Sequence, residues 1–299
     1  MDHVTTPEGL ELEVLVTGPE DGFPLVFHSG TPSAAVPFPQ LERALGSADL
    51  RMFSYSRPGY GTSTPRPARS PAWAVTDDVA DTVAILDALG VGAFVTMGWS
   101  GGGPRALACA ALLPSRCRAA LTLGGVAPYD AIGLNFLAGM GPENVRDFEA
   151  AAAGRDVLAP LIQEEVAAIS AVTAADITAA FGELVDEVDA AALTGEFAEY
   201  IAASFRRASV QGSAGFLEDS LVMVRPWGFD VAEITIPVGV WQGAHDLMVP
   251  FSHGQWLAAH VPGARVHLFD DEGHLTLFTR IGEILAELRE LAGLPTTSV

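Results

Sequence analysis

Short apolar runs alternate with segments of helical periodicity over most of this chain, and this alternation restricts the possible folds more than any other feature. In one helical segment, Val75, Val79 and Val83 recur every four positions. Strands that alternate with helices pair as parallel neighbours, and the helices cover both faces of the sheet. We therefore predict an α/β fold with a mainly parallel sheet. The runs predicted as strands are 12–16, 24–28, 51–55, 93–97, 119–123, 236–241 and 265–269.

The alternation stops between residues 129 and 229, where the chain is rich in alanine and acidic residues and shows no apolar run typical of a strand. Apolar residues such as Leu158 and Ile162 recur there at helical spacing. A block of this length between two strands is expected to form a separate helical layer. We predict a core domain of residues 1–128 and 230–299 and a helical cap domain of residues 129–229.

The stretch VTMGWSGGGPR, residues 95–105, places Ser100 between a predicted strand and a predicted helix. Pro104 suits the first turn of that helix, where a missing N–H costs nothing. Glycines at positions 98 and 102 would let strand and helix pass close to a strained serine. A phosphate-binding loop is the alternative, but it needs a lysine, and this chain has none. The dinucleotide-binding pattern also fails, because Ser100 stands at its second glycine. Ser100 is therefore predicted to be a nucleophile.

A serine nucleophile needs a base and an acid that orients the base. His274 follows the last predicted strand, and Asp246 follows the strand before it. Both would lie at the same sheet edge as Ser100, in the chain order Ser, Asp, His. Rival acids are Asp130, after an earlier strand, and Asp270 and Asp271, which are too close to His274 in the chain to reach its Nδ1 easily.

With these motifs, the chain resembles the α/β-hydrolase family over essentially its whole length. Residues 98–102 match the G-x-S-x-G nucleophile elbow, 243–246 resemble the acid loop and 273–274 the histidine loop. Residues 56–63, SRPGYGTS, resemble the family's R-x-G-x-G-x-S turn. The resemblance implies a mainly parallel eight-stranded sheet with flanking helices and an inserted cap. It also implies Ser100 as nucleophile, Asp246 as acid and His274 as general base.

The loop expected to stabilise the oxyanion departs from the family pattern. It usually contains His-Gly-x, whereas this chain has His28-Ser29-Gly30-Thr31-Pro32. Pro32 has no N–H, so the expected backbone donors are Thr31, which we prefer, or Gly30. The second donor is expected to be the N–H of Gly101. We interpret His28 as a packed structural residue.

These observations predict a serine hydrolase that cleaves an ester or related acyl compound through an acyl-enzyme. Its substrate would be a small apolar molecule, bound in a pocket to which Trp99, Phe136 and Met140 contribute. An equally good interpretation of Phe136 and Met140 is that they pack in the core of the cap. The same triad also serves cofactor-free perhydrolases and haloperoxidases, carbon–carbon bond hydrolases and small-molecule receptors with slow turnover. A further alternative is an aminopeptidase similar to proline iminopeptidases. Acids available in this chain to bind a free amino group are Glu164, Glu165 and Glu187.

The composition narrows the possible partners. A net charge of −21 argues against nucleic acid and against anionic membrane surfaces. The absence of lysine excludes Schiff-base chemistry, and the seven histidines lack metal-ligand spacing, so we expect no cofactor and no metal. Cys109 and Cys117 do not form a disulfide framework. Without a signal-peptide pattern or a membrane-spanning apolar run, a cytoplasmic protein is expected. No prediction of oligomeric state follows.

Overall fold

The computed structural model describes residues 1–67 and 72–295, and in this part of the chain eight strands form one sheet. Their spatial order is β1–β2–β4–β3–β5–β6–β7–β8. The β1–β2 and β2–β4 pairs are antiparallel, and every other neighbouring pair is parallel, so the sheet is mixed but mainly parallel. The strands are β1 Asp2–Thr5, β2 Glu11–Thr17, β3 Phe23–His28, β4 Leu50–Tyr55, β5 Phe94–Trp99, β6 Cys117–Leu123, β7 Val238–Gly243 and β8 Arg265–Phe269.

Seven of these strands overlap the seven predicted runs, whereas β1 was not predicted as a strand. Only Val4 of its four residues is buried, so the apolar signal in the sequence is too weak to reveal it. The helix α1, Pro39–Ala48, is a second element that the periodicity argument did not identify. The fold class itself is confirmed.

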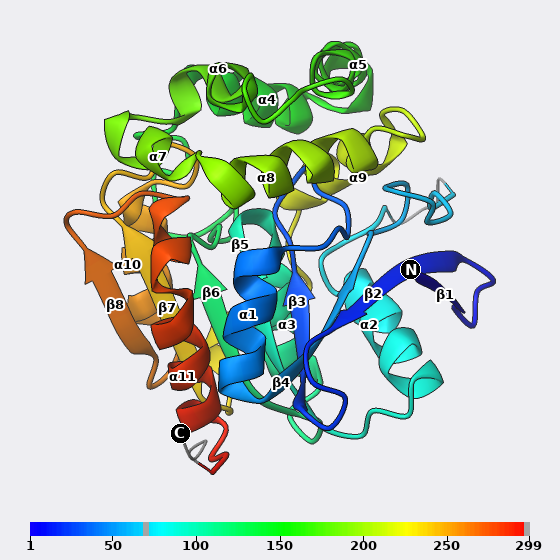
Figure 1. The fold of residues 1–299 in the computed structure, drawn as a ribbon. Coiled ribbons are helices and arrows are strands. Elements are labelled where there is room, and N and C mark those ends of the chain that lie inside the picture. The colour runs from blue at the N-terminus through cyan, green and yellow to red at the C-terminus, as the bar shows by residue number, and fades with distance from the viewer. Residues whose placement is uncertain (68–71, 296–299) are drawn as a thin grey trace.

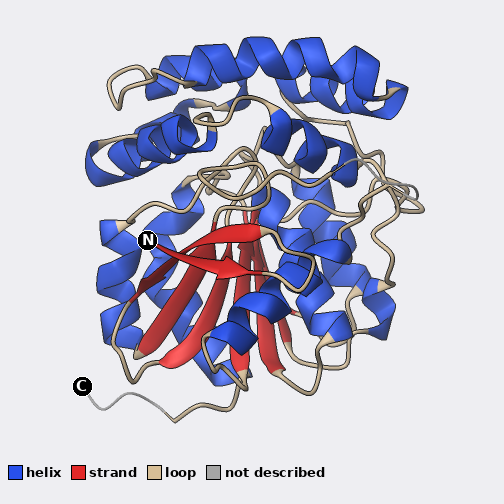
Figure 2. Cartoon of the chain, turned by 90° about the vertical axis from the view of Figure 1, so that its right-hand side faces the viewer, coloured by secondary structure: helices blue, strands red, loops and turns tan. Residues whose placement is uncertain are grey.

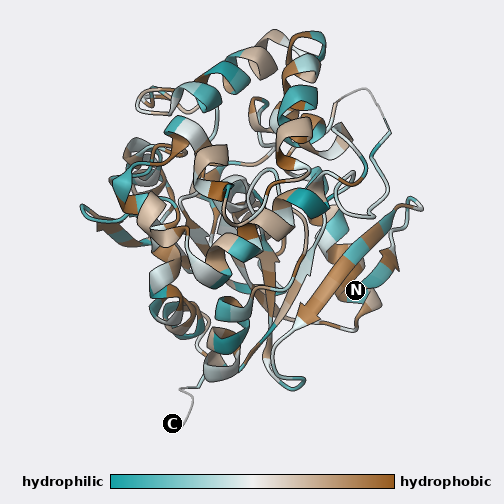
Figure 3. Cartoon of the chain, turned by 45° about the horizontal axis from the view of Figure 1, so that its top comes forward, coloured by the Kyte–Doolittle hydropathy of each residue, from teal (hydrophilic) through white to brown (hydrophobic). Residues whose placement is uncertain are grey.

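Helices cover both faces of the sheet (Figures 1 and 2). Leu25 and Phe27 of β3 pack in one hydrophobic cluster with α1 and with α11, Ile281–Leu291. Val26, which points to the opposite face, packs in a second cluster. That cluster includes residues of α2 Asp77–Ala88, α3 Gly103–Leu112 and α10 Phe251–His260. In Figure 3 the strands inside the molecule are mostly brown, as expected for a sheet buried on both sides.

The segment between β6 and β7 is helical and contains no strand. Its helices lie above the carboxyl ends of the parallel strands, in the upper part of Figure 1. None of the helices in the described ranges is long and apolar enough to cross a membrane. The helices of this segment are α4 Pro142–Ala153, α5 Arg155–Ile169, α6 Ile177–Phe181, α7 Glu187–Ala192, α8 Gly195–Ala208 and α9 Ala214–Met223.

The sheet register brings the candidate site together. His28 at the end of β3 is aligned with Gly98 of β5. Gly243 at the end of β7 is aligned with Phe269 at the end of β8. Because these strands run parallel, the loops that follow them leave the sheet at one edge, beneath the helical segment.

Candidate active site

Ser100 occupies a strained turn between β5 and α3. Its φ angle is +55°, a left-handed conformation that residues other than glycine rarely adopt. The turn leaves no space for larger neighbours: a Cβ added at position 98 would lie 2.3 Å from the Gly102 carbonyl oxygen, and one at position 102 would lie 2.0 Å from the His28 carbonyl oxygen. The predicted tight strand-to-helix turn, with small residues on both sides of the serine, is confirmed.

The structure brings His274 and Asp246 together. His274 Nδ1 lies 2.7 Å from Asp246 Oδ2, and both side chains are buried. The other Asp246 oxygen accepts the backbone N–H groups of Met248, at 2.9 Å, and Val249, at 2.7 Å. The three rival acids, Asp130, Asp270 and Asp271, are exposed.

Ser100 and His274 line one small cavity of about 40 Å³, together with Gly30, Thr31 and Trp99. The Trp99 ring centroid lies 5.4 Å from that of His274, so the indole packs beside the imidazole. The Ser100 hydroxyl has no hydrogen-bond partner among the described residues, and catalytic hydrogen bonds often form only when substrate binds. The three predicted triad side chains therefore meet at one place, although they come from three separate loops.

The electrostatic environment of His274 suits a general base. Burial alone lowers its pKa, but the charge and hydrogen bond of Asp246, helped by the charge of Asp189, outweigh burial and raise the pKa above its ordinary value. The hydrogen bond to Asp246 also directs the Nδ1 proton towards the carboxylate, which leaves Nε2 free to accept a proton.

The predicted oxyanion loop lies against the serine turn. A Cβ added at position 30 would lie 3.3 Å from Ser100 Cβ, and one added at Gly101 would lie 3.7 Å from the Thr31 nitrogen. His28 is buried behind this loop, where its Nε2 lies 3.7 Å from the Sγ atom of Cys109. Burial lowers the pKa of His28 to about 3, so it is neutral, which agrees with a structural residue.

A larger cavity, of about 360 Å³, extends from Ser100, Thr31 and Gly101 into the helical segment. Most of its wall is apolar, and it is built from α4, α5, α6, α8 and α9. The apolar wall residues are Pro32, Val126, Phe148, Ala151, Ala168, Ile169, Ala180, Phe181, Leu184, Phe205, Phe216, Met223, Met248 and Val249.

Two of the three predicted pocket residues lie elsewhere. Phe136 and Met140 line neither of the cavities that contain Ser100. Phe136 packs instead against Tyr129, Phe148 and His253, and Met140 is buried in the hydrophobic core. The loop after β6 folds back onto α10, where the Phe136 carbonyl lies 2.8 Å from His253 Nε2, so its apolar side chains fill the core. Only Trp99 of the three predicted residues borders the site.

Apart from Thr31 and Ser100, the polar side chains of the larger cavity belong to α4, α5 and α9. Burial, together with the neighbouring Asp147, raises the pKa of Glu165 to about 8, although Arg146 pairs with both acids. Of the three acids considered as a site for an amino group, Glu165 borders this cavity, whereas Glu164 and Glu187 are exposed and do not.

Two acids that the sequence analysis missed reach the site from the helical segment. Asp189 of α7 is fully buried and accepts the backbone N–H groups of His274, Leu275 and Thr276 at 2.7, 2.7 and 3.1 Å. Asp219 of α9 binds Arg57, the arginine of the turn motif, and also Arg105 of α3. No local signal distinguishes these two from the many other acids between residues 129 and 229.

The two cysteines are free and buried. Within residues 1–67 and 72–295, no cluster of three or more His, Cys, Asp or Glu side chains is arranged to hold a metal ion.

Comparison with known proteins agrees with this fold. A 129-residue segment is 32% identical to a non-heme chloroperoxidase of Streptomyces lividans and covers 43% of this chain and 46% of the chloroperoxidase, so the match spans about half of that relative. A hydrolase from Pseudomonas aeruginosa PA01 has a similar structure, with a TM-score of 0.68, 21% identity and 98% coverage of both chains. An esterase from Thermogutta terrifontis matches with a TM-score of 0.65 and 20% identity over 97% of this chain and 96% of its own.

A bromoperoxidase from Bacillus anthracis shares the same fold, with a TM-score of 0.67 and 19% identity over 97% of this chain and 99% of its own. At such identities the structural matches establish the fold alone. The family model described as alpha/beta hydrolase fold matches residues 24–281, which is most of the sequence. The chain therefore belongs to the alpha/beta hydrolase fold family.

Proposed function

We propose that this protein is a serine hydrolase that cleaves a small ester or related acyl substrate through an acyl-enzyme. The observation that carries the proposal is the buried His274–Asp246 pair, 2.7 Å apart, at a cavity that Ser100 also lines. Membership of the alpha/beta hydrolase family, and the fold shared with an esterase, support it.

In the proposed reaction, the Ser100 hydroxyl attacks the substrate carbonyl while His274 Nε2 takes its proton. Asp246 holds the imidazole in the required tautomer and stabilises its positive charge. The N–H groups of Gly101 and of Thr31 or Gly30 bind the oxyanion. His274 then protonates the leaving alcohol, and water activated by His274 releases the acid from Ser100.

We further propose that residues 129–229 act as a cap domain over a core of residues 1–128 and 230–299. The wall of the 360 Å³ cavity supports this role, because it combines the serine loop with helices of that segment. A cavity of this size, with mostly apolar walls, suits the acyl or alkyl part of a small substrate.

The test is labelling with a fluorophosphonate, followed by a panel of p-nitrophenyl esters and aminoacyl-nitroanilides. The wild type should be labelled at Ser100 and should turn over esters, whereas Ser100→Ala should do neither and should unfold at nearly the same temperature. Labelling that persists in Ser100→Ala would refute the assignment. Turnover of anilides alone would make the protein an aminopeptidase, and labelling without turnover of any substrate would favour a receptor.

A second candidate, perhydrolysis, is favoured by the similarity to the Streptomyces chloroperoxidase. Hydrogen peroxide would replace water in attacking the acyl-enzyme, would give its proton to His274 and would release a peroxy acid. The peroxy acid would then oxidise halide to hypohalous acid and become the carboxylic acid. Halogenation of monochlorodimedone in the presence of acetate, bromide and peroxide, abolished by Ser100→Ala, would show this activity.

A further inference from the structure

We propose that Asp219, on α9 of the helical segment, is a positioning residue for the oxyanion hole. This role rests on the proposed serine-hydrolase function. Asp219 is not at the sheet edge and does not line the cavities that contain Ser100. It would act through Arg57 and Arg105, which hold the two loops that carry the oxyanion donors.

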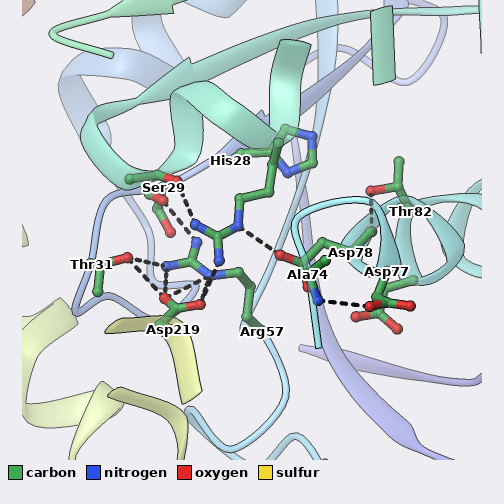
Figure 4. A network of polar contacts seen from close by, with 12 residues as sticks. His28, Ser29, Thr31, Arg57, Ala74, Asp77, Asp78, Thr82 and Asp219 are labelled. Carbon is green, nitrogen blue, oxygen red and sulfur yellow. Dashed lines mark hydrogen bonds and ion pairs between the residues drawn. The ribbon is translucent and has the colours of Figure 1, made fainter. Parts of the chain in front are cut away.

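Asp219 is almost completely buried and connects two buried arginines, Arg57 and Arg105; Figure 4 shows its contact with Arg57. Its Oδ2 atom accepts Arg57 Nη2 at 2.5 Å and Nε at 3.0 Å, and its Oδ1 atom accepts Arg105 Nη2 at 2.7 Å. The Thr31 hydroxyl donates to Oδ2 at 2.8 Å, and the Tyr60 hydroxyl does so at 3.1 Å.

Arg57 uses its other N–H groups to hold the backbone of the oxyanion loop (Figure 4). Its Nη1 donates to the Ser29 carbonyl at 2.8 Å, and its Nη2 donates to the Gly30 carbonyl at 2.7 Å. A carbonyl and the following N–H belong to one planar peptide group, so fixing one fixes the direction of the other. Arg57 therefore orients the N–H groups of Gly30 and Thr31, the two candidate donors on this loop.

Arg105 holds the serine turn less directly. Its Nη1 donates to the Gly101 carbonyl at 2.5 Å, which fixes the peptide group between Gly101 and Gly102, adjacent to the peptide group that carries the Gly101 N–H. Its Nε donates to Asp78 at 2.7 Å, so Arg105 has a second carboxylate partner. Among the described residues, Asp219 is the only carboxylate paired with Arg57. Without the Asp219 charge, Arg57 would be a buried guanidinium with no paired carboxylate among the described residues, influenced by the charge of Asp78 but not paired with it.

The charge state of Asp219 is compatible with this role. Burial raises the pKa of its carboxyl group, but Arg105 and Arg57 outweigh burial and lower the pKa to about 2. Asp219 is therefore ionised at any pH at which the enzyme would work. The same helix contributes Phe216, Ser220 and Met223 to the wall of the 360 Å³ cavity. The helix α9 thus borders the 360 Å³ cavity and, through Asp219 and Arg57, also anchors the oxyanion loop.

The test compares Asp219→Asn with Asp81→Asn, a matched control. Asp81 is also buried and belongs to the connected set of ion pairs; within residues 1–67 and 72–295 its ion-pair partner is Arg66, and it contacts neither oxyanion loop. With the p-nitrophenyl ester that the wild type cleaves fastest, Asp219→Asn should lower kcat by about 10², similar to the loss of one oxyanion donor, with KM changed less than about threefold. Fluorophosphonate labelling should slow by a similar factor. Asp81→Asn should keep kcat within about twofold of the wild-type value, because Asp81 pairs with Arg66 and contacts neither oxyanion loop.

A readout that does not depend on turnover is backbone hydrogen exchange. Peptides that cover residues 29–32 and 100–103 should exchange faster in Asp219→Asn than in Asp81→Asn. If Asp219→Asn does not fold, Thr31→Val replaces it, because it removes the hydroxyl that joins Asp219 to Arg57 but keeps the backbone donor. That variant should lower kcat by about tenfold.

Equal kcat and equal exchange in the folded Asp219→Asn and Asp81→Asn variants would overturn the positioning role and leave the hydrolase assignment intact. A loss of kcat/KM in Asp219→Asn that appears entirely in KM would also overturn the positioning role. A wild type that is neither labelled at Ser100 nor active on any ester would instead overturn the proposed function, and the role of Asp219 with it.

Discussion

Replacing Asp246 by asparagine should lower kcat by about 10⁴ without a comparable change in KM. The contacts of Asp246 determine how the amide would sit. Its Oδ1 position accepts two backbone N–H groups, from Met248 and Val249, so the amide oxygen must occupy it. The amide nitrogen then takes the Oδ2 position, 2.7 Å from His274 Nδ1 and 2.9 Å from Gln242 Nε2, whose hydrogen bond to Oδ2 is lost in the variant.

An amide N–H at that position donates to Nδ1 and forces the imidazole proton onto Nε2. In this tautomer, Nε2 cannot accept the Ser100 proton, although the side chains remain in place. The same replacement in other triad enzymes lowers kcat by about 10⁴, which corresponds to about 5.5 kcal/mol of transition-state stabilisation. Substrate binding depends on the cavity walls, so KM should change by less than about threefold.

The assay is steady-state hydrolysis of the preferred p-nitrophenyl ester, with thermal unfolding to confirm that each variant is folded. Asp130→Asn is the matched control, because Asp130 was the main rival for the acid and is exposed. It should change kcat by less than about tenfold. The tautomer argument would be wrong if Asp246→Asn kept more than a tenth of the wild-type kcat, and a larger loss in Asp130→Asn would move the acid to that position.

Two further predictions concern the protonation of His274. Only the neutral form of His274 can accept the serine proton, so kcat/KM should rise as the pH passes the His274 pKa. That pKa should lie above 6.5, because Asp246 and Asp189 outweigh the effect of burial. A pH–rate profile in which kcat/KM rises well below pH 6.5 would contradict this. Asp189→Asn removes one of the charges that raise the His274 pKa, so it should shift the acid limb of the profile to lower pH. It also places an amide N–H against the His274 backbone N–H, so it should lower the plateau kcat. An unchanged limb in the same profile would show that Asp189 holds the loop without influencing the base.

Local patterns in the sequence were sufficient to predict the fold class and to nominate the candidate catalytic residues. Hydrophobic periodicity depends only on residues that are close together in the chain and can therefore be read from the sequence. It predicted seven strands and the helical segment between β6 and β7. The glycines around Ser100 predicted its strained turn, because only residues without a side chain fit at Gly98 and Gly102. Topology alone then placed His274 and Asp246 at the same sheet edge.

Only the tertiary structure decided how distant segments meet. The sequence left open whether Phe136 and Met140 line the pocket or pack in the core, and only the structure shows them packed in the core. The hydrogen bond between Asp246 and His274, which supports the sequence-based choice of Asp246 over Asp130, also forms only in the tertiary structure. Asp189 and Asp219 lie in a segment rich in acids, and nothing in their neighbours marks them. Their roles come from partners more than 80 positions away in the chain, and only packing of the helical segment onto the sheet makes those contacts.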